Sequence, residues 1–256
     1  MTEDRELILV DSHAHLEMEQ FDSDREQMIA RAREAGVESI VAIGSGTGPG
    51  SLDCGIQLAE KYELIYATIG IHPHEAKLAT DADFQELGQL ARKPKVIAWG
   101  EIGLDYFYDH SPRDVQKQVF LKQLERAGAA RLPVVIHCRP SDGSDNAWQD
   151  CLSLLEQHWR ATSLGGILHC FTGNWSYAKR ALDLGFMISF AGNITFPKAQ
   201  QIREAATQVP LDRILIARQL GELRGISTEE VGCVTASNFY NFFRLAESNK
   251  EKVPGR

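Results

Sequence analysis

Two histidines, His13 and His15, are separated by one residue at the end of the first apolar run of the chain. In an extended strand, side chains at positions i and i+2 point to the same side, so both imidazoles can reach one point in space. Neutral imidazole is the commonest side-chain ligand of a catalytic divalent metal. The spacing therefore indicates part of a metal site, although two histidines that hydrogen-bond at a strand end would show the same pattern.

Further candidate ligands follow later apolar runs. Glu101 comes after the run 96–99, His137 after 134–136 and His169 after 166–168. A carboxylate after a buried strand needs a partner, and a metal ion or an arginine is favoured over water. Each of these two histidines alone could equally be a hydrogen-bonded core residue. Taken together with His13, His15 and Glu101, however, His137 and His169 are predicted to be metal ligands.

Four histidines and one glutamate suit two adjacent divalent cations, with Glu101 as the bridging and catalytic carboxylate. A two-metal site can activate a water molecule and stabilise the attacking and leaving oxygens of phosphoester hydrolysis. Histidine and carboxylate ligands suit Zn or Mn and tolerate Mg, so the ligand types do not choose the metal.

Three further residues bear on substrate binding. Arg139 could hold a phosphate, or it could pair with Asp142. We expect His72 to face the substrate and His74 to cap the loop that follows it.

The elements that position these residues alternate between strand and helix. Near-continuous apolar runs are typical of parallel strands buried on both faces. The expected strands are 7–10, 39–43, 65–71, 96–99, 134–136, 166–168, 187–190 and 213–216. Capping-box patterns at Ser23 and Ser227 predict helix starts. Eight such units predict an α/β fold, namely a single (β/α)8 TIM barrel over residues 1–256. The metal site is expected at the carboxyl ends of its strands. A doubly wound sheet is the alternative fold.

Composition narrows the class of protein. The chain has 256 residues, is 43% hydrophobic and carries a net charge of −8. This charge argues against a broad basic surface for nucleic acid, but not against an enzyme that holds a few phosphates through metal ions. The five cysteines are scattered singly, the N-terminal segment is charged, and no apolar run has the length of a membrane span. We therefore expect a cytoplasmic protein with no membrane partner and no evident obligate protein partner.

Taken in order, the motifs resemble those of the TatD family of metal-dependent DNases, from about residue 7 to 245. They are Asp11–Leu16, Gly70–Pro73, Gly100–Tyr106, Ile136–Arg139 and Leu168–Gly173. The resemblance implies a distorted TIM barrel that hydrolyses DNA, often as a 3′–5′ exonuclease. It also implies that His13 and His15 bind one ion, that His137 and His169 bind the other, and that Glu101 bridges them.

The chain departs from the family pattern after its eighth strand. In the family, a Glu-Thr-Asp segment follows, and its Asp binds the first metal and is the expected general base. Here residues 211–216 resemble the eighth strand, but the residues from Ala217 onward already resemble the family's last helix. Neither nearby carboxylate can replace the Asp: Asp212 begins the strand, at the opposite end of the barrel from the site, and Glu222 lies a helical turn or more beyond the expected position. Either a loop is missing from this sequence or the protein truly lacks it. We favour the first, because a barrel strand fused to its helix leaves no room for the chain to reverse.

Two other functions remain open. A related barrel amidohydrolase could act on C–N or ester bonds of a small molecule, because fold does not fix function. Such enzymes often use a carboxylated lysine as bridge, whereas here Glu101 is at the strand end. A catalytically impaired metal-binding barrel becomes credible if the loop is truly absent.

DNA, as single strands or 3′ ends, is the expected substrate.

Overall fold

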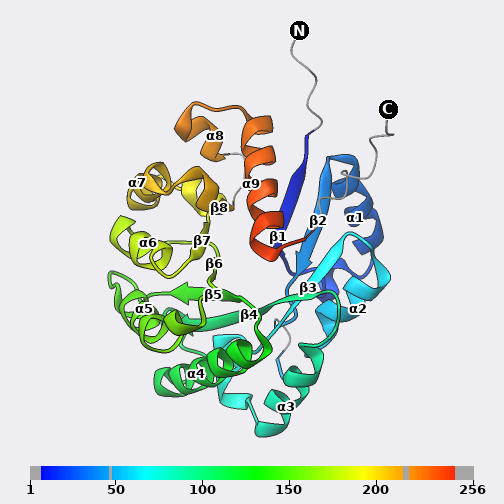
Figure 1. The fold of residues 1–256 in the computed structure, drawn as a ribbon, viewed down its shortest axis with the longest axis vertical. Helices are drawn as coiled ribbons and strands as arrows, with labels where there is room; N and C mark the ends of the chain where they lie inside the picture. The colour runs from blue at the N-terminus through cyan, green and yellow to red at the C-terminus, as the bar shows by residue number, and fades with distance from the viewer. Residues whose placement is uncertain (1–6, 46–47, 216–218, 246–256) are drawn as a thin grey trace.

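The fold is a barrel of parallel strands surrounded by helices (Figure 1). The computed structural model describes residues 7–45, 48–215 and 219–245. Eight strands pair in sequence order, each parallel to the next. They are β1 (Leu9–Ala14), β2 (Val37–Ala42), β3 (Ile65–Ile69), β4 (Val96–Asp105), β5 (Val134–Arg139), β6 (Gly166–Leu168), β7 (Phe186–Ser189) and β8 (Ile214–Leu215). The predicted (β/α)8 barrel is confirmed.

Helices connect the strands and cover the outside of the barrel (Figure 1). The α-helices are α1 (Arg25–Glu34), α2 (Cys54–Lys61), α3 (Asp81–Leu90), α4 (Arg113–Ala130), α5 (Asn146–His158), α6 (Trp175–Leu182), α7 (Gln200–Gln208), α8 (Gln219–Arg224) and α9 (Thr228–Phe243). Short 3₁₀ turns lie between them: η1 (Glu19–Phe21), η2 (Pro73–Leu78), η3 (Arg160–Thr162), η4 (Gly192–Thr195) and η5 (Leu211–Arg213).

Strands β2 to β8 contain buried residues, whereas the residues of β1 are half-buried or, at Asp11, exposed. On β2, Ile40 and Ala42 belong to the core between the sheet and the helices. Val41, between them, and Ile43, which follows the strand, belong to a second core inside the barrel. Because successive side chains point to opposite faces, both sets must be apolar, which explains the near-continuous apolar runs in the sequence.

Helix α9 packs against both β1 and β8, the first and last strands of the sheet (Figure 1). The Asn238 side-chain amide donates hydrogen bonds to the carbonyl oxygens of Leu211 and Ile214, at 2.7 and 2.8 Å. Phe239 is fully buried in the inner core. Burial of such a side chain stabilises the fold by about 1.5–3 kcal/mol. The last helix therefore helps to complete a barrel in which, within the described residues, β8 and β1 do not pair.

Three strands run further than predicted, and the first of them is β1, which continues to Ala14. β4 continues to Asp105 and β5 to Arg139, paired residue by residue from Ile102 with Ile136 onward. Glu101 and His137 therefore lie within strands and do not follow them. The apolar pattern stops early because polar side chains occupy the strand positions that face the site.

The two predicted helix starts have different outcomes. Ser227 is the N-cap of α9, and its side chain accepts a hydrogen bond from the Glu230 backbone N–H at 3.1 Å. The Ser23 prediction is wrong, because α1 starts from Asp24 and no side chain caps it. The Asp24 carboxylate instead accepts a hydrogen bond from Arg31 at 3.3 Å.

Candidate metal centre

Four of the predicted ligands meet at the carboxyl end of the barrel. Nε2 of His13 lies 3.2 Å from Nε2 of His15 and 3.2 Å from Oε2 of Glu101. Nε2 of His15 lies 3.7 Å from the same carboxylate oxygen. The other oxygen, Oε1, lies 2.8 Å from Nδ1 of His137. Glu101 is 3% exposed and stands between the histidines of β1 and β5.

Local backbone features place Glu101 there. The pairing of β4 with β5 shifts register between Trp99 and Ile102, as in a β-bulge, which re-aims the side chains at that point. Gly103 follows with φ of +140°, and a Cβ on it would lie 2.0 Å from the carbonyl oxygen of His137. Only glycine tolerates this close approach. The glycine therefore allows β4 to lie against β5 where both carry site residues.

Among the described residues, two groups of side chains have the spacing of metal ligands, and Glu101 belongs to both. One joins it with His13 and His169, the other with His72 and His137, and in each group the ligand atoms lie within 4.8 Å of one another. The His13 and His169 rings stack at 3.3 Å. The structure thus places His169 beside His13, whereas the family resemblance implies a pairing of His169 with His137.

The donor set fits divalent cations. Nδ1 of His13 and Nδ1 of His169 are buried and have no hydrogen-bond partner among the described residues. Buried polar atoms without a partner are rare in folded proteins, and a nitrogen lone pair can be satisfied by a cation. Imidazole nitrogens beside a buried carboxylate are also the ligands that Zn and Mn prefer. The residues present can therefore hold metal ions.

The charges of the site depend on its hydrogen bonds. Burial opposes ionisation of Glu101, but His13 and His137 outweigh it and hold the pKa of this carboxyl well below its usual range. Burial would lower the pKa of His137, yet its bonds to Asp105 and Glu101 raise it to about 9. Burial lowers the pKa of His72 and of His169 to about 3, so both are neutral at pH 7.

These pKa values predict that the metal-free protein is most stable near pH 6.5, the ordinary pKa of histidine. From pH 6.5 to 9 the folded protein keeps a proton on His137 that the unfolded chain releases, so stability falls as the pH rises. From pH 6.5 towards 3 the unfolded chain binds protons at His72 and His169 that the folded protein excludes, so stability falls as the pH drops. Each pKa unit corresponds to about 1.4 kcal/mol. Urea denaturation of chelator-treated protein from pH 4 to 10 measures this, and stability that rises from pH 6.5 to 9 would contradict it.

Asp105 belongs to the site although its role was not predicted. Its Oδ2 lies 2.9 Å from Nε2 of His74 and 2.9 Å from Nε2 of His137. Its Oδ1 accepts hydrogen bonds from the backbone N–H groups of Phe107 and Tyr108, at 3.0 and 2.8 Å. Despite burial, the bonds from His137 and His74 hold the pKa of this carboxyl well below its usual range. Asp105 thus orients two imidazoles and the loop after β4.

His72 has a capping role that was not predicted, and His74 does not have the role expected for it. Nδ1 of His72 accepts a hydrogen bond from the backbone N–H of His74 at 3.2 Å, so His72 caps η2. His74 instead extends to Asp105. The prediction that His74 caps the loop is therefore wrong, because the cap is the residue that directly precedes Pro73. Nε2 of His72 stays available to the site.

Glu17 holds His15 from outside the cluster. Its Oε1 lies 3.1 Å from Nδ1 of His15, and its side chain is 2% exposed. A carboxylate on the second nitrogen of a ligating histidine fixes the ring and makes it a stronger ligand. We expect Glu17→Gln to weaken metal binding about 10- to 100-fold, as measured by calorimetric titration with Zn or Mn. Glu19→Gln, at an exposed position in η1, is the control, and equal affinities in both variants would contradict the prediction.

Arg139 is held by aromatic rings. Its Cζ lies 4.0 Å from the centre of the Phe107 ring and 4.6 Å from that of Tyr108. Cation–π contacts of this kind stabilise a guanidinium without neutralising it. No ion pair joins Arg139 to Asp142 in the part of the chain that the structure describes. Of the two interpretations of Arg139, phosphate binding is therefore the one that the contacts favour.

The segment after β8 bears on the missing aspartate. Residues 216–218, where the chain departs from the family pattern, lie outside the described residues. β8 itself consists of Ile214 and Leu215, so within the described residues this strand adds no carboxylate to the cluster.

Across the same described part of the chain, no helix combines the length and the apolar character that crossing a membrane requires.

Together, the parallel barrel and the candidate metal ligands at its carboxyl rim are the features of a barrel metal-dependent hydrolase. A family model described as TatD related DNase matches residues 10–217, and the chain belongs to this family. The match ends where the expected aspartate segment is missing.

Relatives with known names agree with this assignment. The chain is 35% identical to the "Uncharacterized metal-dependent hydrolase YabD" of Bacillus subtilis, over 93% of this chain and 100% of that protein. The alignment runs over 263 residues, more than the 256 of this chain, so YabD has residues without a counterpart here. The chain is 36% identical to the "3'-5' ssDNA/RNA exonuclease TatD" of Cronobacter turicensis, over 77% of this chain and 72% of that protein. The solved structure of YjjV, a TatD homologue from Escherichia coli K12, superposes with a TM-score of 0.84 at 27% identity, covering 94% of this chain and all of that one.

Proposed function

We propose that this protein is a two-metal nuclease that hydrolyses phosphodiester bonds of single-stranded DNA from the 3′ end. The observation that carries the proposal is Glu101, a buried ionised carboxylate shared by two groups of histidines on one rim. A relative is named as a 3′–5′ exonuclease on single-stranded DNA and RNA, which supports the same substrate class. The five single cysteines favour the cytoplasm as its compartment.

In this proposal His13, His15, His137 and His169 are metal ligands, and Glu101 lies between the two ions. When bound, the ions supply the positive charge that activates a water molecule and stabilises the oxygens of the phosphodiester. Glu101 and Asp105 each lie within hydrogen-bond distance of one ring nitrogen of His137 and orient that imidazole.

Two residues of the rim are proposed to bind the substrate. Arg139 carries a positive charge that has no carboxylate partner among the described residues, so it can bind a phosphate. His72 presents Nε2 to the same rim, because its Nδ1 is used by the η2 cap.

A chelator-sensitive assay on 3′- and 5′-end-labelled oligonucleotides tests this function. Metal-loaded protein should shorten single-stranded DNA from its 3′ end, and EDTA should stop the reaction. Cleavage of an amide or lactone with DNA left intact would overturn the proposal in favour of a barrel amidohydrolase.

Binding of metal without turnover of any of these substrates would instead identify a catalytically impaired barrel. The YabD alignment keeps this candidate open, because it shows that the chain lacks residues present in a relative. The mass of the intact protein decides whether a loop follows Ile216 in the polypeptide.

A further inference from the structure

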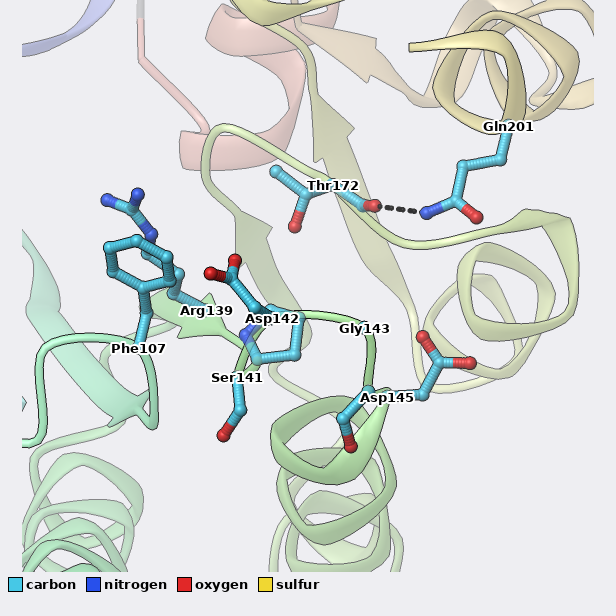
Figure 2. A pocket seen from close by; sticks show the side chains of 10 residues that line it. Phe107, Arg139, Ser141, Asp142, Gly143, Asp145, Thr172 and Gln201 are labelled. Carbon is cyan, nitrogen blue, oxygen red and sulfur yellow. Dashed lines mark hydrogen bonds between the residues drawn. The ribbon is translucent and has the colours of Figure 1, made fainter. Parts of the chain in front are cut away.

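A cavity opens beside the metal centre, between the loops that follow β4, β5 and β6 (Figure 2). Its volume is about 500 Å³, within the range of sites that enclose small molecules. The residues that line it include Phe107, Arg139, Asp142, Asp145, Thr172 and Gln201.

The cavity adjoins the metal ligands along the chain. Phe107, Arg139 and Thr172 follow Asp105, His137 and His169 by two or three residues. An extended residue spans about 3.3 Å, so the cavity begins within about 10 Å of the cluster. A nucleotide next to the cleaved phosphate would therefore reach it.

One side of the cavity is flat. The Arg139 guanidinium lies 4.0 Å from the Phe107 ring centre, and Figure 2 shows the two groups together at one side of the opening. We call Phe107 and Arg139 the stacking wall. Phe107 is 40% exposed, so part of its ring is accessible to a ligand in the cavity. Aromatic rings and arginine planes are the surfaces on which nucleobases stack.

The rest of the cavity is polar and carries two carboxylates. The carboxylates of Asp142 and Asp145 line it, and Figure 2 shows that of Asp142 directed towards the space between Arg139 and Thr172. Within the part of the chain that the structure describes, the buried Thr172 hydroxyl has no hydrogen-bond partner. Gln201 donates to the Thr172 carbonyl oxygen at 3.1 Å. Carboxylates repel a phosphate but accept hydrogen bonds from the amino group of a base. The cavity thus fits a flat, uncharged ligand with a polar edge.

We propose that this cavity binds one unpaired nucleobase of the substrate strand, stacked on the wall of Phe107 and Arg139. The inference rests on the proposed nuclease function and deepens it. A base inside a duplex is already paired and stacked, so this site selects single strands. The Arg139 guanidinium lines the same cavity, and its positive charge binds the backbone phosphate next to that base.

Binding of a hydrolysis-resistant phosphorothioate oligonucleotide to the metal-loaded protein, measured by fluorescence anisotropy, tests the proposal. Phe107→Ala should weaken binding of the single strand about 5- to 100-fold, the usual effect of losing one stacking residue. Phe107→Trp should keep the affinity, because the ring is retained. Phe196→Ala is the matched control, since Phe196 is an aromatic residue 63% exposed on the loop after β7 and does not line the cavity.

A scan with one abasic residue moved along the oligonucleotide identifies the nucleotide. At one position the missing base should weaken binding to the wild-type protein but not to Phe107→Ala, because the base and the ring are then coupled. Wild-type affinity in Phe107→Ala, or equal losses in Phe107→Ala and Phe196→Ala, would overturn the base site while leaving the nuclease function intact. If wild-type protein neither binds nor cleaves single-stranded DNA, the proposed function fails, and this site with it.

Discussion

The Glu101→Ala variant is expected to lose hydrolysis by about 10³-fold or more and to lose most of its bound metal. Glu101 is the one residue common to both ligand groups, and its two oxygens face His13 on one side and His137 on the other. Without it, two cations at this rim would repel each other with no anion between them. Charge stabilisation by metal ions contributes several kcal/mol to such reactions, and each 1.36 kcal/mol is tenfold in rate.

Metal content by mass spectrometry and single-turnover cleavage of DNA measure the two effects. Glu101→Gln keeps the size of the side chain and removes its charge, so it should resemble Glu101→Ala in metal content. Glu75→Gln, in η2 on the same rim but outside both ligand groups, should retain metal and activity. Full metal content and wild-type turnover in Glu101→Ala would show that this carboxylate does not join the ions.

The sequence predicts the barrel because most strands, unlike β1, are buried on both faces. Val41 and Ile43 fill the inside of the barrel while Ile40 and Ala42 pack under the helices, so no polar residue interrupts the run. The ends of the strands were less predictable. Glu101 interrupts the apolar pattern of β4, yet the strand continues because the interruption faces the site.

The residues that support the ligands could not be assigned from spacing alone. Asp105 is four residues from Glu101 on one strand, and Glu17 is two residues from His15, so in each pair the side chains can share a side. Whether a carboxylate reaches an imidazole depends on packing between strands distant in sequence. Whether the His74 side chain caps the following loop or reaches Asp105 depends on the conformation of the turn at Pro73, which the sequence does not specify.

The Asp105→Asn variant is expected to lose about 3–5 kcal/mol of folding free energy in the metal-free protein, the usual effect of removing one partner from a buried ion pair. The side chain of Asp105 is 1% exposed, and its Oδ2 is shared by His74 and His137. Asparagine keeps an oxygen for the backbone N–H groups of Phe107 and Tyr108 but cannot stabilise a positive charge on His137. The pKa of His137 should therefore fall, and the loss of stability between pH 6.5 and 9 should shrink in the same variant.

Urea denaturation across this pH range separates that mechanism from a general loss of packing. Asp150→Asn is the matched control, because the Asp150 side chain is 39% exposed and pairs with Lys117 and the Tyr106 hydroxyl near the surface. Exposed pairs contribute about 0–1 kcal/mol, so this variant should lose little stability and keep the pH dependence of the wild type. If Asp105→Asn lost no more than Asp150→Asn, or kept the full alkaline loss, Asp105 would not be the group that holds His137 in its charged form.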